Sequence, residues 1–191
     1  MEYGIEEEHR PTPFFSSKED IEKKKGRRAL SRFKYLQALI TEFQDTSDDI
    51  AKQQILSHLA NFAYDPVNYD WFRQLHIIDL FMDVLDDETC TKCQEFAVAG
   101  ICNLCIDPQN AKLILMNGNV GIIMKTLSSN AEETVLSGIT TLFYLLSPLT
   151  KNTICTKSVL QCVEKYKSSN NIRLKNLATI FLQESEKLML V

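Results

Sequence analysis

The sequence predicts an all-α protein, a right-handed solenoid of about three and a half helical repeats. Apolar anchors recur along the chain at intervals of 42, 38 and 38, at Leu59, Ile101, Ile139 and Leu177. Each anchor is followed by a small residue and, three positions later, by an apolar one, a pattern typical of a closely packed helix face. The chain of 191 residues has only six glycines and five prolines, which suits helices joined by short turns. Repeats of this period indicate stacked helical units.

The apolar periodicity also places the individual helices. A half-unit is expected first, with helices near 32–44 and 49–64. Three full units follow, with long third helices expected near 88–106, 131–146 and 172–187. A unit of about 40 residues with a longer third helix is of the armadillo/HEAT class. Because such units bury their apolar faces only by stacking, residues 29–191 are predicted to form one armadillo-repeat domain.

Turn residues occur at matching places in the first two full units. Asp65-Pro66 and Asp107-Pro108 predict helix starts, because Asp accepts a backbone N–H bond and Pro needs none in the first turn. Gly118 is expected in a sharp turn between the first and second helices of its unit. His76 occupies the equivalent slot one unit earlier. Since a left-handed backbone tolerates His poorly, that turn is expected to differ.

Residues 1–28 differ from the rest of the chain. They hold seven basic and seven acidic side chains and show no helical periodicity. Segments of this composition do not bury enough apolar surface to fold, so residues 1–28 are predicted to be a disordered, mixed-charge arm. The run KKKGRR within it is a nuclear-import signal, a phosphate contact or simply a solvated flexible stretch. Its basic residues are Lys23, Lys24, Lys25, Arg27 and Arg28.

Charge is unevenly distributed over the remaining residues. Residues 29–148 hold seven basic and fifteen acidic side chains, whereas 149–191 hold seven and three. The acidic part is a poor candidate for binding phosphates and favours basic protein segments as partners. The basic end supports an alternative function, direct contact with RNA. The residues expected to make that contact are Lys151, Lys157, Lys165, Lys167, Arg173 and Lys175.

The cysteines raise the question of a metal site. No apolar run reaches the ~18–20 residues of a membrane span, and the start lacks a signal-peptide pattern, so all six cysteines are expected to be thiols in a reducing compartment. The pairs Cys90–Cys93 and Cys102–Cys105 have zinc-site spacing. However, one predicted helix carries both pairs and separates them by ~13.5 Å. We therefore predict no metal, no cofactor and no contact with a membrane.

Catalysis has little support in the sequence. The three histidines are His9, His58 and His76, and no nucleophile elbow, phosphate-binding loop or metalloprotease motif occurs. His58 replaces Gly100 and Gly138 in the repeat register, which predicts a packing role. The chain is therefore expected not to be an enzyme and to have no small-molecule substrate.

Sequence motifs in every unit resemble the armadillo-repeat family. They are YLQALITEFQ, ANFAYDPVNY, GICNLCIDPQN, LSSNAEETVLSGITTL and RLKNLATIFL, and the resemblance covers about residues 33–185. It implies a small scaffold that pairs with an RNA-recognition-motif protein, RNA-binding motif protein 48. It also implies a role in splicing of minor (U12-type) introns, through indirect association with a spliceosomal ribonucleoprotein. The expected location is the nucleus, with the cytoplasm as a second site.

The resemblance also implies a binding groove. In armadillo repeats a third-helix asparagine commonly faces the concave surface, where its amide pairs with the backbone of an extended peptide. The repeat register assigns the groove residues Asn61, Asn103, Ser57, Glu95, Glu133, Ser137 and Thr141. Importin-type armadillo proteins place tryptophans one turn earlier, and this chain has none there. In the alternative interpretation, each asparagine instead bonds the backbone of the neighbouring unit, and the two roles are compatible.

Overall fold

The computed structural model describes residues 17–19, 21, 30–87, 89–116 and 118–190, and every regular element among them is a helix. The half-unit consists of α2 (Arg32–Asp45) and α3 (Asp49–Ala63). Within the described ranges, no helix combines the length and hydrophobicity of a membrane span.

Three full units follow the half-unit. The first contains η1 (Pro66–Asn68), α4 (Tyr69–Gln74), α5 (Ile77–Asp86) and α6 (Thr91–Leu104). The second contains α7 (Pro108–Ile114), α8 (Asn119–Lys125), η2 (Thr126–Ser128) and α9 (Glu132–Leu145). The third contains α10 (Lys151–Ile154), α11 (Lys157–Tyr166) and α12 (Ile172–Met189). The five long helices begin and end within three residues of their predicted bounds, so the all-α armadillo/HEAT-like solenoid is confirmed.

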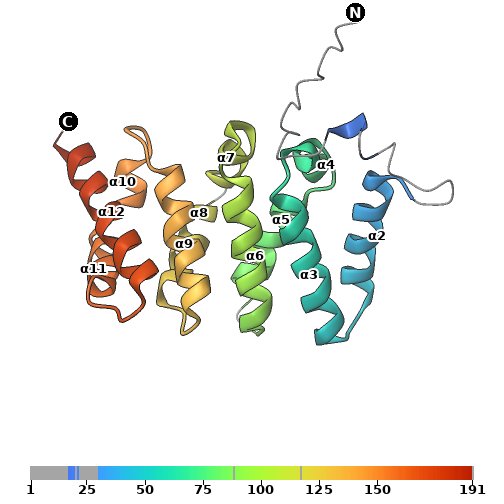
Figure 1. The fold of residues 1–191 in the computed structure, drawn as a ribbon, viewed down its shortest axis with the longest axis horizontal. Coiled ribbons are helices and arrows are strands. Elements are labelled where there is room, and N and C mark those ends of the chain that lie inside the picture. Colours follow the sequence, from blue (N-terminus) through green and yellow to red (C-terminus); the bar gives the residue numbers. More distant parts are fainter. Residues whose placement is uncertain (1–16, 20, 22–29, 88, 117, 191) are drawn as a thin grey trace, which may run out of the picture.

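The long helices stack side by side in chain order (Figure 1). We call α3, α6, α9 and α12 the third-helix layer, in which each helix packs against the next. The anchors Leu59, Ile101 and Ile139 are fully buried within it. One hydrophobic core runs from Leu36 of α2 to Phe181 of α12. The stacking therefore buries what no single unit could bury alone.

Local turn chemistry is mostly as the sequence predicts. Asp65 accepts a hydrogen bond from the N–H of Val67, and Asp107 caps α7 in the same way. Gly118 adopts the left-handed region at φ 79°. His76 is also left-handed, at φ 54°, so the expectation of a different turn there is wrong. The turn keeps the geometry of its glycine counterpart and bears the strain of a side chain.

His58 does not have the packing role that its register predicts. At the equivalent place in α6, a Cβ on Gly100 would lie only 2.4 Å from the ring of Phe81, because the two helices are in close contact. His58 is exposed instead. The bulky ring does not fit such a contact and lies at the surface of the half-unit.

Polar contacts join the first and second units. Arg73 of α4 donates to Asp107 Oδ1 at 2.9 Å and to Asn110 Oδ1 at 2.8 Å, at the start of α7. Within the first unit, the hydroxyl of Tyr69 in α4 donates to the carbonyl oxygen of Asn103 in α6 at 3.1 Å. Asp107 of the Asp-Pro turn therefore caps α7 and also binds Arg73 of the preceding unit.

Part of the N-terminal arm contacts the domain. Lys18 lies 3.1 Å from Asp70 Oδ2 and 5.5 Å from the centroid of the Trp71 ring. The segment Lys23–Arg28 lies outside the described residues, as does most of 1–28. Disorder of the arm therefore stays a prediction, and Lys18 is a point at which it meets α4.

Candidate protein-binding face

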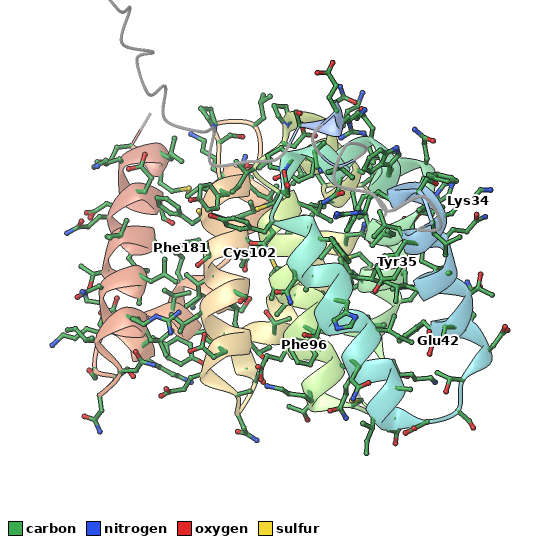
Figure 2. The ribbon with its side chains drawn as sticks, turned by 45° about the vertical axis from the view of Figure 1, so that its right-hand side comes forward. Lys34, Tyr35, Glu42, Phe96, Cys102 and Phe181 are labelled. Atoms are coloured by element: carbon green, nitrogen blue, oxygen red, sulfur yellow. A yellow bond between two sulfur atoms is a disulfide. The ribbon has the colours of Figure 1, made fainter. Side chains whose placement is uncertain are left out.

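Contacts between neighbouring helices show which side of the third-helix layer is open. Asn103 of α6 donates from Nδ2 to the Ala60 carbonyl oxygen of α3 at 3.1 Å. Cys102, the residue before it (labelled in Figure 2), contacts Thr141 of the next helix, α9. Successive residues of a helix point about 100° apart. The direction midway between Asn103 and Cys102 therefore points toward neither α3 nor α9 but out of the layer. Residues two before and five after each anchor point in that direction, and we call the surface that they form the third-helix face.

Small residues form the centre of this face. Ser57, Ala99 and Ser137 lie two positions before the anchors of α3, α6 and α9, and all three are half-buried. Ser57 and Ser137 are two of the residues that the sequence assigns to the groove. Small side chains leave room for the backbone of a partner to come close.

A row of exposed apolar residues runs along one edge of the face. Tyr64, Ile106 and Tyr144 lie five positions after the anchors and are 53%, 60% and 54% exposed. Contiguous exposed apolar surface commonly marks an interaction site. None of the three is among the residues that the sequence assigns to the groove, although they recur in the same register as the anchors, at intervals of 42 and 38. That recurrence is the signal that would have found them.

The acidic residues assigned to the groove are paired within the chain. Glu95 forms an ion pair with Lys92, one turn earlier on α6. Glu133 accepts two hydrogen bonds from the guanidinium of Arg173, at 2.8 and 3.4 Å, across α9 and α12. The charge available to a basic partner on this face is therefore smaller than the sequence suggests.

The two asparagines have different surroundings. Asn61 is exposed, and its amide makes no hydrogen bond to any residue that the structure describes. Asn103 is half-buried and bonds the backbone of the preceding unit, as the alternative interpretation held.

Thr141 is fully buried, and its hydroxyl donates to the Ser137 carbonyl oxygen. Its assignment to the groove is wrong, because it lies between α6 and α9 rather than on their surface.

The residues proposed to contact RNA do not form one patch. Lys151 donates to the Leu188 carbonyl oxygen, near the end of α12. Arg173 lies in the first turn of α12, about 22 Å away at 1.5 Å per residue. Lys167 pairs with Glu164 at 2.8 Å. The remaining three are exposed, namely Lys157, Lys165 and Lys175.

The cysteines differ in one respect from the prediction. Cys90 and Cys93 form a disulfide at the start of α6, with Cα atoms 5.2 Å apart, so the expectation of six thiols is wrong for this pair. A hydrogen bond between the thiols of Cys102 and Cys105 lowers the pKa of Cys102 and raises that of Cys105. Among the described residues, no three His, Cys, Asp or Glu side chains are placed to hold a metal ion.

The fold and this face define an armadillo-repeat solenoid. One similar solved structure is a designed armadillo repeat protein in complex with the peptide (KR)4, with a TM-score of 0.71 and 17% identity over 88% of this chain and 69% of that one. Another is of computationally designed armadillo repeat proteins for modular peptide recognition, with a TM-score of 0.69 and 18% identity. That match covers 78% of this chain and 63% of the other, so this chain spans less than two thirds of that design. At these identities the likeness concerns the fold alone.

Sequence similarity narrows the class to a family. No protein-family model matches the sequence. Armadillo repeat-containing protein 7 from Mus musculus is 47% identical over 157 residues, which are 81% of this chain and 79% of the mouse protein. The chain belongs to the armadillo repeat-containing protein 7 family.

Proposed function

We propose that this protein is a non-enzymatic scaffold that binds a protein partner through its third-helix face. The observation that carries the proposal is the exposed row of Tyr64, Ile106 and Tyr144 beside the small residues of that face. Two structurally similar designed proteins, one in complex with the peptide (KR)4 and one for modular peptide recognition, support peptide binding by this fold.

The geometry of the face suggests the chemistry of the bound segment. Exposed Asn61 offers an amide that can pair with a peptide C=O and N–H. The apolar row offers contacts to apolar side chains of the same segment. Because Glu95 and Glu133 are already paired, a basic segment gains less from this face than an apolar one.

The resemblance that supports the family also suggests a partner and a setting. The proposed partner is an RNA-recognition-motif protein, RNA-binding motif protein 48. The proposed setting is minor (U12-type) intron splicing in the nucleus, with indirect contact to the spliceosomal ribonucleoprotein and a second pool in the cytoplasm. Lys23–Arg28 are the proposed nuclear-import signal.

The test is co-expression with RNA-binding motif protein 48, followed by co-purification and titration calorimetry. We define the face variant as Asn61→Ala combined with Tyr144→Ala, and the matched control as Leu149→Ala, an exposed apolar residue outside the face. We expect the face variant to bind about tenfold more weakly at unchanged melting temperature, and the control to bind normally. A stable complex that the face variant leaves intact would refute this docking face. Failure of the wild-type chain to form any complex would refute the partner.

Direct RNA contact is the second candidate function, supported by the exposed side chains of Lys157, Lys165 and Lys175. It predicts binding of RNA by the isolated chain, with affinity that falls steeply with salt. Absence of binding at low salt would exclude it.

A further inference from the structure

A groove separates α2 from α5 at the half-unit end of the solenoid, and it shares no residue with the third-helix face. It encloses about 470 Å3. Its floor is apolar, with Ile40 and Phe43 from α2 and Leu80 and Val84 from α5, all half-buried against the core. The two helices make little contact with each other, and α5 packs chiefly against α6. An apolar groove between helices is the shape that receives an amphipathic helix.

One wall of the groove carries a line of carboxylates. Asp79 and Asp83 lie four residues apart on one side of α5, about 6 Å along the helix, and Asp87 follows directly after the helix ends. All three are exposed. Asp79 lies 3.1 Å from His76 Nδ1, and Asp87 accepts a hydrogen bond from the Thr89 N–H. Asp83 makes no side-chain hydrogen bond or ion pair with any described residue, so its charge is open to a partner.

A basic side chain of the protein already lies in this groove. The ammonium of Lys52 is 5.7 Å from the centroid of the Phe43 ring. The pKa of Asp87 is lowered, first by hydrogen bonds from Thr89 and then by the charge of Lys52. The groove therefore holds a cation with its ammonium over an aromatic ring and its charge near a carboxylate. Three aspartates line the groove against one lysine, which leaves negative charge for further cations.

We propose that this groove is a second docking site, which binds a basic amphipathic helix of a protein partner. The helix places apolar side chains on the floor and Lys or Arg, every fourth residue, opposite the carboxylates of α5. An extended peptide fits poorly, because among the described lining residues only Gln44 carries an amide for its backbone. Nucleic acid is disfavoured, because the carboxylates repel phosphate.

The probe is a fluorescein-labelled synthetic helix of about five turns, with leucines at i, i+3 and i+4 spacing and lysines every fourth residue along its flank. Binding to the full chain is measured by anisotropy at about 50 mM and 300 mM salt, over which range surface ion pairs are increasingly screened. The groove variant is Asp79→Asn with Asp83→Asn. The charge control is Glu164→Gln with Glu186→Gln, two exposed acids at the other end of the solenoid. The face variant reports on the alternative surface, and thermal melts check that each variant is folded.

We expect saturable binding that weakens with salt, and a Kd that rises about tenfold in the groove variant but less than twofold in the charge control and the face variant. In NMR spectra, the shifted methyl signals are expected at Ile40, Leu80 and Val84. An equal loss in the groove variant and the charge control overturns the proposal, because it indicates attraction to net charge alone. A loss confined to the face variant, no binding at low salt, or shifts outside the groove overturns it as well.

Discussion

Replacing Asn103 by alanine tests whether this residue braces the repeats. Its side-chain amide donates to the carbonyl oxygen of Ala60, 3.1 Å away in the preceding unit. α3 ends at Ala63, so the Ala60 carbonyl is one of the last four in that helix, which have no intrahelical partner. Asn103→Ala removes a hydrogen bond worth about 1 kcal/mol and leaves the carbonyl of buried Ala60 unsatisfied, a combined cost of about 1–2 kcal/mol. For a domain of this size that lowers the melting temperature by about 3–6 °C.

The matched variant is Asn61→Ala, the same substitution at the equivalent position one unit earlier. Asn61 is exposed and its side chain bonds to no described residue, so its replacement is expected to cost less than about 0.5 kcal/mol. Thermal melts followed by circular dichroism, together with urea unfolding, measure both variants. Equal stability of the two variants would refute the bracing role of Asn103. A larger loss in Asn61→Ala would reverse the assignment of the two asparagines.

Three further predictions concern packing, backbone strain and charge. Gly100→Ala is expected to lower the free energy of unfolding in urea by about 1–3 kcal/mol, because the new Cβ overlaps the buried ring of Phe81. Its control is Gly121→Ala, where an added Cβ meets no atom within 4 Å, and which is expected to be stabilising by about 0.5 kcal/mol. His76→Gly is expected to raise stability by up to about 1 kcal/mol, because glycine relieves the left-handed strain, and an unchanged or lower midpoint would contradict this. Hydrogen bonds from Lys18 and then Arg73 lower the pKa of Asp70, so Lys18→Ala is expected to raise it toward its usual value in an NMR titration. The stability from this contact is present above about pH 4, the usual pKa of Asp, and is lost as pH falls through the lowered pKa.

The sequence predicts those features that depend on neighbouring residues in the chain. The spacing of the anchors predicts which residues are buried, and Asp65-Pro66 predicts a helix start. Both predictions succeed because they depend only on local geometry. Features that depend on how two helices face each other were not predicted. Thr141 and Asn103 hold the same register, yet one is buried and the other half-exposed. The ion pair of Glu133 with Arg173 joins residues 40 apart, which no local pattern reveals.

The unequal repeat lengths have a consequence for how such a protein tolerates insertions. The chain between Leu85 and the next anchor, Ile101, is longer by about one helical turn than the chain between Leu127 and Ile139. The additional residues fall in the connection before α6 and in its first turn, around Cys90–Cys93. Because the addition is close to a whole turn, it lengthens the helix ahead of its anchor without rotating its exposed side. Ile106 therefore stays in register with Tyr64 and Tyr144, and a change of length by a whole turn at this connection leaves the third-helix face undisturbed.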